Sequence, residues 1–513
     1  MRAKRPPHRL EAARPSDTIA TDGGPGRATD STAPDRVRDG RTPGGPATIL
    51  LLTLCFGLAT GAGEVALQAV RAFALDRYIP ELSLHAVWMT PVAYVLVFLV
   101  PGAIFLALAF ARPSATLERV AIGTYATIAV LPPFIIFRKL HWLAVVVLAV
   151  GVGVQAARLA ARYRALIHRA LSPTVLALAA VTAIAGGAVT ASRMFAERSA
   201  LNALPAVRDA RTNVLLIVLD TVRRLSSSLQ PAGDRPTSML AAIAERGVRF
   251  DRAYSTAGWT LPSHASMFTG RYPSETKVSF IRPLDATYPT LAEVLAGFGY
   301  ETAGIVANTG YTGRQSGLSR GFIHYEDHPV SVTQTLGSAA LVRGILHSST
   351  VRALIGYHDV LGRKSATTIN RDFLGWLDRR GGRPFFAFLN YFDAHAPYLP
   401  NAPFDTMFGV STEGRTPLLT EQPFIRIRWP TPELKRELAA YEQSTAQLEA
   451  AVASLLEQLD RRGVLDSTIV IVTSDHGEGF GEHGIHGHAY SLNSTVVGVP
   501  LIVVAPELVP SAT

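Results

Sequence analysis

Residues 213–219 read NVLLIVL, an uninterrupted apolar run that ends directly at Asp220. Because the run does not alternate between apolar and polar residues, it predicts a central parallel strand that is buried on both faces. Two later runs have the same form, since PFFAFLNYF ends at Asp393 and STIVIVTS ends at Asp475. Doubly wound α/β sheets place their chemistry at the carboxyl ends of the strands. We therefore expect Asp220, Asp393 and Asp475 at the functional edge of one sheet.

The segments between these strands alternate between helical and extended patterns. Residues 289–299 contain the helical TLAEVLAGFG, and the strand-like ETAGIVAN follows. Residues 431–463 hold a long amphipathic helix that Gly463 stops. This alternation predicts an α/β fold with a doubly wound, mostly parallel sheet flanked by helices. We assign the domain to residues 212–513.

Five apolar stretches precede this domain, at residues 48–70, 87–111, 118–137, 140–160 and 172–192. Each is near the ~20 residues that a helix needs to cross a bilayer. Buried helices of soluble proteins keep a polar stripe, which residues 86–111 lack. The third and fourth stretches are separated only by residues 138–141, so one re-entrant hairpin is an alternative. We expect an all-α transmembrane bundle of about five helices at 48–192, and a linker at 193–211.

Charge gives this bundle an orientation. The net charge is +9, and much of it lies in residues 1–47 and in the connections between apolar stretches. Two connections are basic, and they hold Arg112 and Arg119, and Arg158, Arg162, Arg164 and Arg169. Basic connections face the cytoplasm. We expect a disordered cytoplasmic tail at 1–47, a multi-pass protein of the cell (inner) membrane, and an extracytoplasmic catalytic domain. This distribution speaks against nucleic acid as a partner.

The chain has one cysteine, Cys55, which excludes an intrachain disulfide and a thiolate metal site. Two strand-end carboxylates, Asp220 and Asp475, together with His476, instead supply hard oxygen ligands and one imidazole. That set suits a divalent cation, with Zn²⁺ or Mn²⁺ preferred and Ca²⁺ as a further option. A strand-end Asp can also cap a helix, but the Asp-His-Gly sequence at 475–477 favours a metal site. Glu478 is expected to support His476 rather than to bind the metal.

Residues 257–273, AGWTLPSHASMFTGRYP, hold a candidate nucleophile. Pro262 restricts Leu261 away from helix, and Ser263 could cap a following helix. Thr260 would then lie just before a helix N-terminus, where backbone N–H groups favour an anion. A metal-bound hydroxyl there can attack phosphorus or sulfur, and His264 could face the same anion. The alternative is that Thr260 is only a turn hydroxyl.

Four motifs in order resemble the sulfatase family of the alkaline phosphatase superfamily: IVLDTVR, GVRFDRAYSTAGWTLPSHASMFTGRYP, YFDAHAPY and IVTSDHGEGFGEHGIHGH. The resemblance covers about residues 212–506 and implies an alkaline-phosphatase-like fold. It also implies metal binding by Asp220, Asp475, His476 and Thr260, with Thr260 as nucleophile. His395 and His488 would contact the transferred anion or protonate the leaving oxygen. A second metal would use Asp393, His395 and His488, and we favour one ion over two.

Two departures from the family pattern bear on the reaction. True sulfatases carry Cys or Ser, converted to formylglycine, where this chain has Thr260, and Arg where it has His264. Thr221 likewise replaces a second carboxylate. A Thr nucleophile is similar to that of lipoteichoic-acid synthases and phosphoethanolamine transferases, which also place about five membrane helices before the catalytic domain. The resemblance therefore favours phosphoester chemistry.

We expect a metal-dependent hydrolase or transferase that acts on phospho- or sulfo-esters of envelope lipid or glycan head groups at the membrane surface, in contact with membrane lipids. The alternatives are a true sulfuric ester hydrolase and a noncatalytic membrane protein with a retained fold. The sequence leaves the oligomeric state open. Because family members usually continue beyond the last strand-like run, the catalytic domain is expected to be shortened at its C-terminus.

Overall fold

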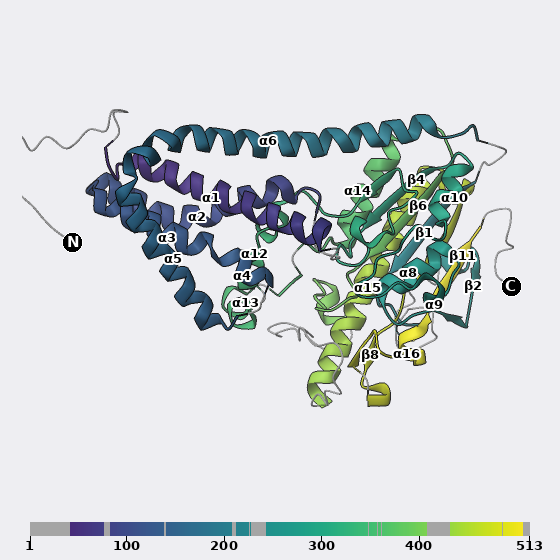
Figure 1. Ribbon diagram of the computed structural model, residues 1–513. Helices are drawn as coiled ribbons and strands as arrows, with labels where there is room; N and C mark the ends of the chain where they lie inside the picture. The colour runs from purple at the N-terminus through teal and green to yellow at the C-terminus, as the bar shows by residue number, and fades with distance from the viewer. Residues whose placement is uncertain are drawn as a thin grey trace, which may run out of the picture.

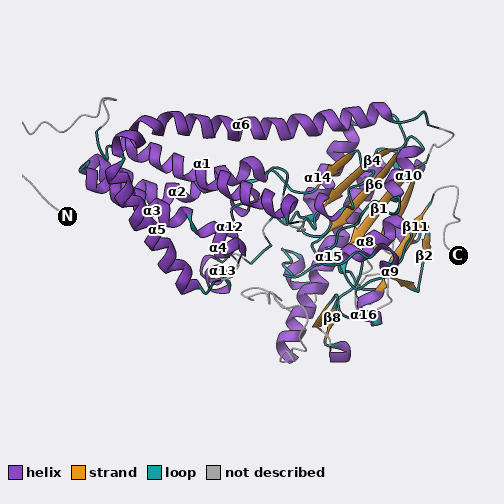
Figure 2. Ribbon diagram, in the orientation of Figure 1, coloured by secondary structure: helices purple, strands orange, loops and turns teal. Residues whose placement is uncertain are grey.

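The computed structural model describes residues 42–75, 83–137, 140–207, 212–224, 226, 243–346, 348–356, 358–360, 362–407, 431–484 and 486–505. The expected disordered tail lies almost entirely outside these residues, as does the expected C-terminal shortening. An elongated helical bundle occupies one end of the molecule and a mixed domain of strands and helices the other (Figures 1 and 2).

The bundle contains the apolar stretches. Its helices are α1 (Pro46–Ala69, extended by η1, Val70–Ala74), α2 (Ala86–Ala111), α3 (Ala115–Ala129), α4 (Leu131–Phe137), α5 (Trp142–Arg162) and α6 (Arg164–Ala203). Counted with α4 joined to α3, five helices among the described residues are long and apolar enough to cross a membrane. The third and fourth spans have 23 and 21 residues, so each is long enough to cross a bilayer, and the re-entrant hairpin stays an alternative.

Small residues allow the membrane helices to approach closely. Gly57 and Gly61 lie one helical turn apart on α1 and face α2. A Cβ atom on Gly57 would lie 2.7 Å from the Cα of Val95, and one on Gly61 would overlap Pro91. Without a strong hydrophobic force between helices in lipid, such backbone contact is a main source of packing energy. Gly57 and Gly61 therefore hold α1 against α2.

The C-terminal domain is built on a seven-stranded sheet in the order β2-β11-β7-β1-β6-β4-β5. The strands are β1 (Asn213–Leu219), β2 (Val248–Arg249), β4 (Glu301–Val306), β5 (His324–Glu326), β6 (Phe385–Tyr391), β7 (Thr468–Thr473) and β11 (Leu501–Val504). β5, β4, β6, β1 and β7 are parallel, and β11 is antiparallel to β7. The predicted mostly parallel sheet with β1 at its centre is confirmed.

Helices cover both faces of this sheet (Figure 2). Leu215 and Ile217 point to one face, where they join the core formed with α14 (Ala366–Arg379) and α15 (Thr431–Arg461). Leu216 and Val218 point to the other, where α8 (Thr260–Thr269) and α10 (Leu291–Gly297) pack. Burial on both faces is the reason that β1 is apolar from Val214 to Leu219. The predicted doubly wound arrangement is thereby confirmed.

Shorter elements complete the domain. They are β3 (Ala253–Tyr254), α9 (Pro273–Thr276), η2 (Arg314–Ser316), α11 (Val332–Gly337), α12 (Ala340–Leu346), α13 (Ser349–Ile355), η3 (Phe404–Thr406), η4 (Leu465–Ser467), β8 (Gly479–Phe480), η5 (Glu482–Gly484), β9 (His486–Gly487), α16 (Ser494–Val497) and β10 (Gly498–Val499).

Helix α6 differs from expectation because it runs without a break through Ala203, well into the expected linker at 193–211. Its last turns lie alongside the C-terminal domain (Figure 1). Arg193 donates to the Tyr325 carbonyl at 2.9 Å, and Glu197 lies 3.2 Å from Nδ1 of His324. These polar contacts join the helix to the edge strand β5. Residues 193–203 are therefore an ordered part of α6.

A second polar contact joins the two parts of the molecule. The Glu64 carboxylate, on α1, accepts the Ala340 N–H at 3.0 Å and the Tyr94 hydroxyl at 2.6 Å. Arg343 lies 3.6 Å away. An acidic side chain buried in a membrane bundle is costly unless it is paired, and here it caps the N-terminus of α12. The catalytic domain is thus fastened to the first membrane helix.

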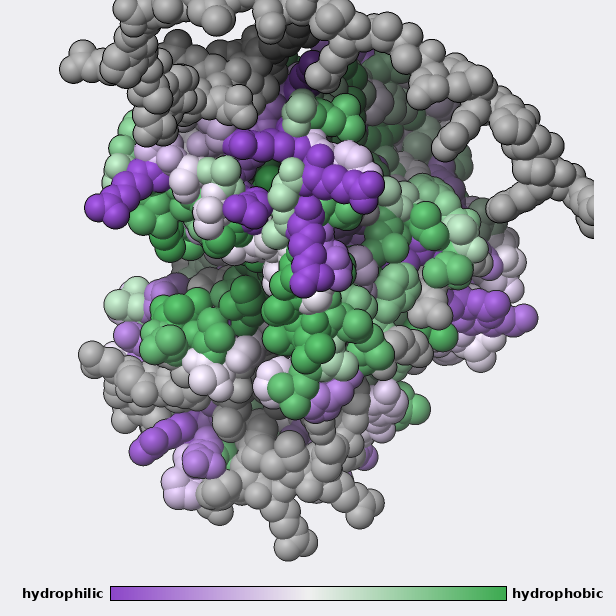
Figure 3. Space-filling model, turned by 60° about the vertical axis from the view of Figure 1, so that its left-hand side comes forward, coloured by the Kyte–Doolittle hydropathy of each residue, from purple (hydrophilic) through white to green (hydrophobic). Residues whose placement is uncertain are grey.

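The end of the bundle away from the catalytic domain is basic. The N-termini of α1, α3 and α6 meet there, because Glu118 accepts the Gly44 N–H at 2.8 Å and lies 2.7 Å from Nε2 of His168. α2 and α5 end just before α3 and α6 begin, so the two basic connections lie at this end. Figure 3, which turns this end forward, shows strongly hydrophilic residues above apolar surface. The arrangement fits the predicted orientation.

Replacing Gly57 by alanine should weaken the contact between α1 and α2. The added methyl group overlaps Val95, and such overpacking costs about 1–3 kcal/mol. We expect a lower unfolding temperature for the detergent-solubilised protein. Gly63→Ala is the matched control, because a Cβ there meets nothing within 4 Å. Equal stability of the two variants would contradict this packing.

Candidate active site

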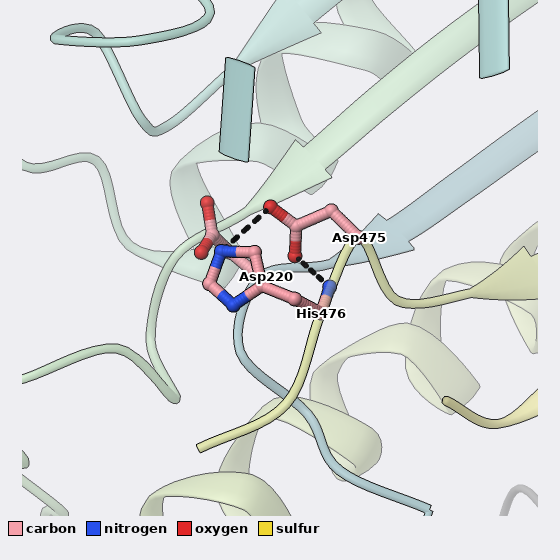
Figure 4. A group of neighbouring side chains, drawn as sticks. All are labelled: Asp220, Asp475 and His476. Atoms are coloured by element: carbon pink, nitrogen blue, oxygen red, sulfur yellow. Dashed lines mark hydrogen bonds and ion pairs between the residues drawn. The ribbon is translucent and has the colours of Figure 1, made fainter. Parts of the chain in front are cut away.

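Three neighbouring strands carry acidic residues to one edge of the sheet, because β7, β1 and β6 are adjacent. Asp220 follows β1, and Asp475 and His476 follow β7. The potential ligand atoms of these three residues all lie within 4.8 Å of one another, and all three residues are buried (Figure 4). Within the described ranges this is the one group of three or more such side chains close enough to hold a metal ion.

Each carboxylate accepts hydrogen bonds from N–H donors on one oxygen, whereas the other oxygen accepts none from the described residues. Asp475 Oδ1 accepts the backbone N–H groups of Thr221 and His476, at 3.2 and 2.9 Å. Asp220 Oδ2 accepts the side-chain amide of Asn308 at 2.8 Å. Asp220 Oδ1 and Asp475 Oδ2 are buried without a hydrogen-bond donor among the described residues. A buried charged oxygen without a partner is costly, so these atoms fit a bound cation.

The electrostatics agree with this assignment. Burial, followed by the repulsion from Asp475, raises the pKa of Asp220 to about 7. Burial also raises the pKa of Asp475 to about 7, against the effect of its N–H donors. Such shifts show how unfavourable two adjacent buried carboxylates are without a positive charge. A divalent cation would supply that charge.

His476 is oriented as a ligand. Its Nδ1 lies 3.0 Å from the Gly477 carbonyl, which can only accept, so Nδ1 carries the proton. Nε2 is left with its lone pair directed toward Asp475 Oδ2 at 3.3 Å and Thr260 Oγ1 at 3.2 Å. Burial lowers the pKa of His476 to about 4. The ring is therefore neutral at pH 7 and available to a metal.

Thr260 is the first residue of α8, whereas the sequence suggested a position just before the helix. Pro262 fits inside the first turn because the N–H it lacks would have no partner in the helix. Ser263 does not cap α8 as expected; its hydroxyl donates to the Asp475 carbonyl at 2.7 Å. That bond joins the nucleophile's helix to the metal-site loop. The Thr260 side chain is only 1% exposed.

Thr221, at the position of the missing carboxylate, shapes the turn after β1. Its φ of 63° is a strained conformation for a β-branched residue. The Thr221 hydroxyl donates to the Asp220 carbonyl at 2.7 Å or the Ala394 carbonyl at 3.0 Å. Thr221 thus holds the loops after β1 and β6 together and leaves the metal ligands to its neighbours.

Asn308 was missed in the sequence. It follows β4, and its amide reaches Asp220 Oδ2 at 2.8 Å and Thr260 Oγ1 at 3.5 Å. The available signal was its position at the end of ETAGIVAN, a fourth parallel strand whose carboxyl end lies at the same edge. Asn308 links the metal group to the nucleophile.

His264 lies beneath the site. Its Nδ1 is 2.8 Å from the Thr260 carbonyl and 3.7 Å from Asp475 Oδ2. Its ring packs edge-on against Phe268 and Phe388 and is fully buried. Burial lowers the pKa of His264 to about 4. A neutral His264 supports the first turn of α8.

His395 and His488 form the more open side of the site. The ring of His488 lies 4.5 Å from that of His476 and 5.1 Å from that of His395. Glu478 Oε1 is 3.0 Å from His488 Nδ1. Although burial opposes the charge, this carboxylate raises the pKa of His488. Burial and then His488 lower the pKa of His395 well below its usual value.

Glu478 therefore supports a different histidine from the one expected. Its two oxygens engage His488 and, at 3.0 Å, the hydroxyl of Tyr398. The hairpin of β8 and β9 brings residue 488 back toward Glu478, a fold-back that spacing along the chain does not reveal. The expected pairing with His476 is wrong, because the Nδ1 of His476 is bonded to Gly477.

Asp393 stands apart from the group. Its Oδ1 accepts the Ala366 N–H at 3.1 Å, at the N-terminus of α14. That is the helix-capping role open to any strand-end Asp. The set of Asp393, His395 and His488 stays a prediction for a second metal, while the group of Asp220, Asp475 and His476 has the donors that one ion needs.

The Sulfatase family model matches residues 212–512. The multifunctional alkaline phosphatase superfamily protein PehA of Trinickia caryophylli is 24% identical over 350 residues, 57% of this chain and 68% of that protein. Iduronate 2-sulfatase of Homo sapiens is 27% identical over 335 residues, 57% of this chain. The chain spans 60% of the length of this human relative.

Two of the solved structures that are similar to this chain have TM-scores below 0.5. The phosphonate monoester hydrolase of Agrobacterium radiobacter has a TM-score of 0.46 and 23% identity, covering 57% of this chain and 68% of that one. The zinc complex of the C-terminal periplasmic domain of EcEptC from Escherichia coli has a TM-score of 0.42 and 16% identity, covering 60% of this chain and 78% of that one.

Metal should stabilise the protein in a pH-dependent way. In metal-free protein the folded state keeps protons on Asp220 and Asp475 up to pH about 7, whereas unfolded Asp loses them near pH 4. Stability should therefore fall as pH rises from about 4 through 7. Added Zn²⁺ or Mn²⁺ should raise the unfolding temperature by about 5 °C or more at pH 8 and much less at pH 5.5, because protons compete.

Two isosteric variants test which carboxylate matters in that thermal-shift experiment. Asp475→Asn should abolish the metal-induced shift at pH 8. Asp393→Asn should keep it, since asparagine can still accept the Ala366 N–H. Loss of the shift in both variants would contradict the assignment.

Proposed function

Since the chain belongs to the sulfatase family, we propose that it is a membrane-bound, metal-dependent phosphoester hydrolase or transferase with Thr260 as nucleophile. The observation that supports this most directly is the position of Thr260. Its Oγ1 lies 3.2 Å from Nε2 of His476, at the positive end of α8. A nucleophile there faces the metal ligands on one side and an anion-favouring helix end on the other.

Thr260 is also the reason to prefer phosphorus over sulfur. The formylglycine of true sulfatases arises from Cys or Ser, and Thr cannot be converted in that way. A hydroxyl activated beside a cation can instead attack phosphorus directly and form a covalent ester. Family membership alone leaves both reactions open, because the relatives include named sulfatases as well as a multifunctional superfamily member.

The residues present fit a divalent cation, which Asp220, Asp475, His476 and Thr260 would hold. When bound, it would supply Lewis-acid stabilisation of the Thr260 alkoxide and of the phosphoryl charge. Asn308 keeps Asp220 and Thr260 in register through its amide. Burial of these side chains excludes water and strengthens each electrostatic contact.

In the proposed reaction Thr260 Oγ1 gives its proton to solvent and forms a bond to phosphorus while the bond to the leaving oxygen breaks. His488 donates a proton from Nε2 to that oxygen, while Nδ1 stays on Glu478. His395 packs against His488 from the open side. Water or a second hydroxyl then attacks phosphorus and gives its proton to His488, while the bond between phosphorus and Thr260 Oγ1 breaks and Thr260 regains a proton from solvent. The identity of the attacking group decides between hydrolysis and transfer.

The proposed setting is the outer face of the cell membrane. The five apolar helices indicate a membrane anchor. The basic end of the bundle supports a cytoplasmic N-terminus and an extracytoplasmic site. Such an anchor keeps the site within reach of lipid or envelope-glycan head groups, which we propose as substrates.

Sulfate-ester hydrolysis is the second candidate, and the named sulfatases among the relatives favour it. An assay of purified full-length protein with aryl sulfate, phosphate monoester and phosphodiester substrates separates the two. Preference for aryl sulfate would overturn the phosphoester proposal.

Removing the nucleophile should stop turnover. Thr260→Ala should lower kcat by about 10³-fold or more, whereas Thr260→Ser, which keeps a hydroxyl, should retain far more activity. Mass spectrometry of acid-quenched wild-type reactions should find a phosphoryl group on the peptide that contains Thr260. Full activity of Thr260→Ala would rule out this role.

A general acid can be recognised by its dependence on the leaving group. His488→Ala should lower kcat by about 10²-fold or more for an alkyl leaving group, which needs a proton. The loss should be much smaller for p-nitrophenolate, which leaves without one. Equal losses for both substrates would instead mean that His488 serves binding or stability.

A further inference from the structure

A pair of short helices in the C-terminal domain carries apolar side chains that are about half or more exposed among the described residues. α12 and α13 lie in the connection between β5 and α14. Leu354 is 85% exposed, Ile355 55% and Ile345 48%. Removing such side chains from water is favourable. Three on one short insertion therefore call for an apolar environment.

The position of these helices identifies that environment. α12 packs against α4, where a Cβ on Gly344 would lie 3.3 Å from Cγ2 of Ile135. Ala339, Leu341 and Val342 join the core of the membrane bundle. Figure 1 places α12 and α13 beside α4, at the end of the bundle nearer the catalytic domain. The exposed side chains thus continue the lipid-facing surface of the spans.

Neighbouring residues mark the same level of the membrane. Phe137 ends α4 with 41% exposure, and Trp142 begins α5 with 65% exposure. Tryptophan at the end of a span is typical of the boundary between lipid tails and head groups. Arg352 on α13 donates to the Asp359 carbonyl at 2.7 Å, so α13 combines a basic residue with apolar ones, as interfacial helices do.

We propose that α12 and α13 form an interfacial insertion of the catalytic domain that dips Ile345, Leu354 and Ile355 into the outer leaflet of the bilayer. The partner is a lipid surface, and the contact is additional to the five spans. A second copy of the chain could also cover these residues, but continuity with the spans favours lipid.

The insertion has a direct connection to the site. Arg363, a few residues after α13, donates to the Pro397 carbonyl at 3.0 Å and lies over the ring of Phe392, 4.9 Å from its centroid. These residues flank His395. The depth of the insertion would therefore set the height of the open side of the site above the head groups.

The contact can be measured without enzymatic activity. In a Cys55→Ser background, Leu354→Cys is labelled with an NBD fluorophore, and the full-length protein is placed in nanodiscs containing doxyl-labelled phosphatidylcholine. Leu492→Cys is the matched control, because Leu492 is also an exposed leucine, at 75%, but it lies just before α16, which is on the far side of the C-terminal domain from the bundle (Figure 1). We expect the label at 354 to lose at least half of its fluorescence and the label at 492 to lose little.

Each outcome decides the proposal. Unquenched fluorescence at 354 overturns it, as does equal quenching at 354 and 492. Efficient disulfide-linked dimerisation through Leu354→Cys, without quenching, assigns the surface to a second copy instead. Because no result depends on catalysis, failure of the enzymatic proposal would leave this test unaffected.

Discussion

The side-by-side burial of Asp220 and Asp475 is the constraint on which the rest of the catalytic domain depends. The two histidines within 4 Å of the Asp475 carboxylate, His264 and His476, have pKa values lowered to about 4 and so bring no charge at neutral pH. The domain meets this constraint with oriented N–H donors and with two oxygens left for a cation. The strained turn at Thr221, the loop bond of Ser263 and the position of Asn308 all keep that arrangement in place.

The sheet could be predicted from sequence because its central strands are buried on both faces, which leaves unbroken apolar runs. β1, β6 and β7 begin and end within a residue of the predicted runs. The carboxylates after β1 and β7 converge because the register pairs Val218 with Thr473. Local pattern was therefore enough to place Asp220, Asp475 and His476 together.

Contacts between distant segments were not predictable in the same way. Glu478 pairs with His488 only because a hairpin folds back, and Asn308 looks like any residue at a strand end. The last turns of α6 read as linker, since the polar residues that bind the edge strand resemble solvent-exposed ones. Asp393 shows the converse. It follows an apolar strand, as Asp220 does, yet its carboxylate accepts a hydrogen bond from a helix N-terminus.

The contact between Glu64 and Ala340 has a consequence for how separable the two halves are. A fragment released by a protease cutting between α6 and β1 would lack contacts that the C-terminal domain makes in the full chain. The shed fragment would lose the carboxylate that terminates α12 and would expose the apolar residues that it buries against the bundle. The membrane bundle thus forms part of the packing of the C-terminal domain. A related chain that exchanged its bundle for another would have to keep the residues of this interface as well.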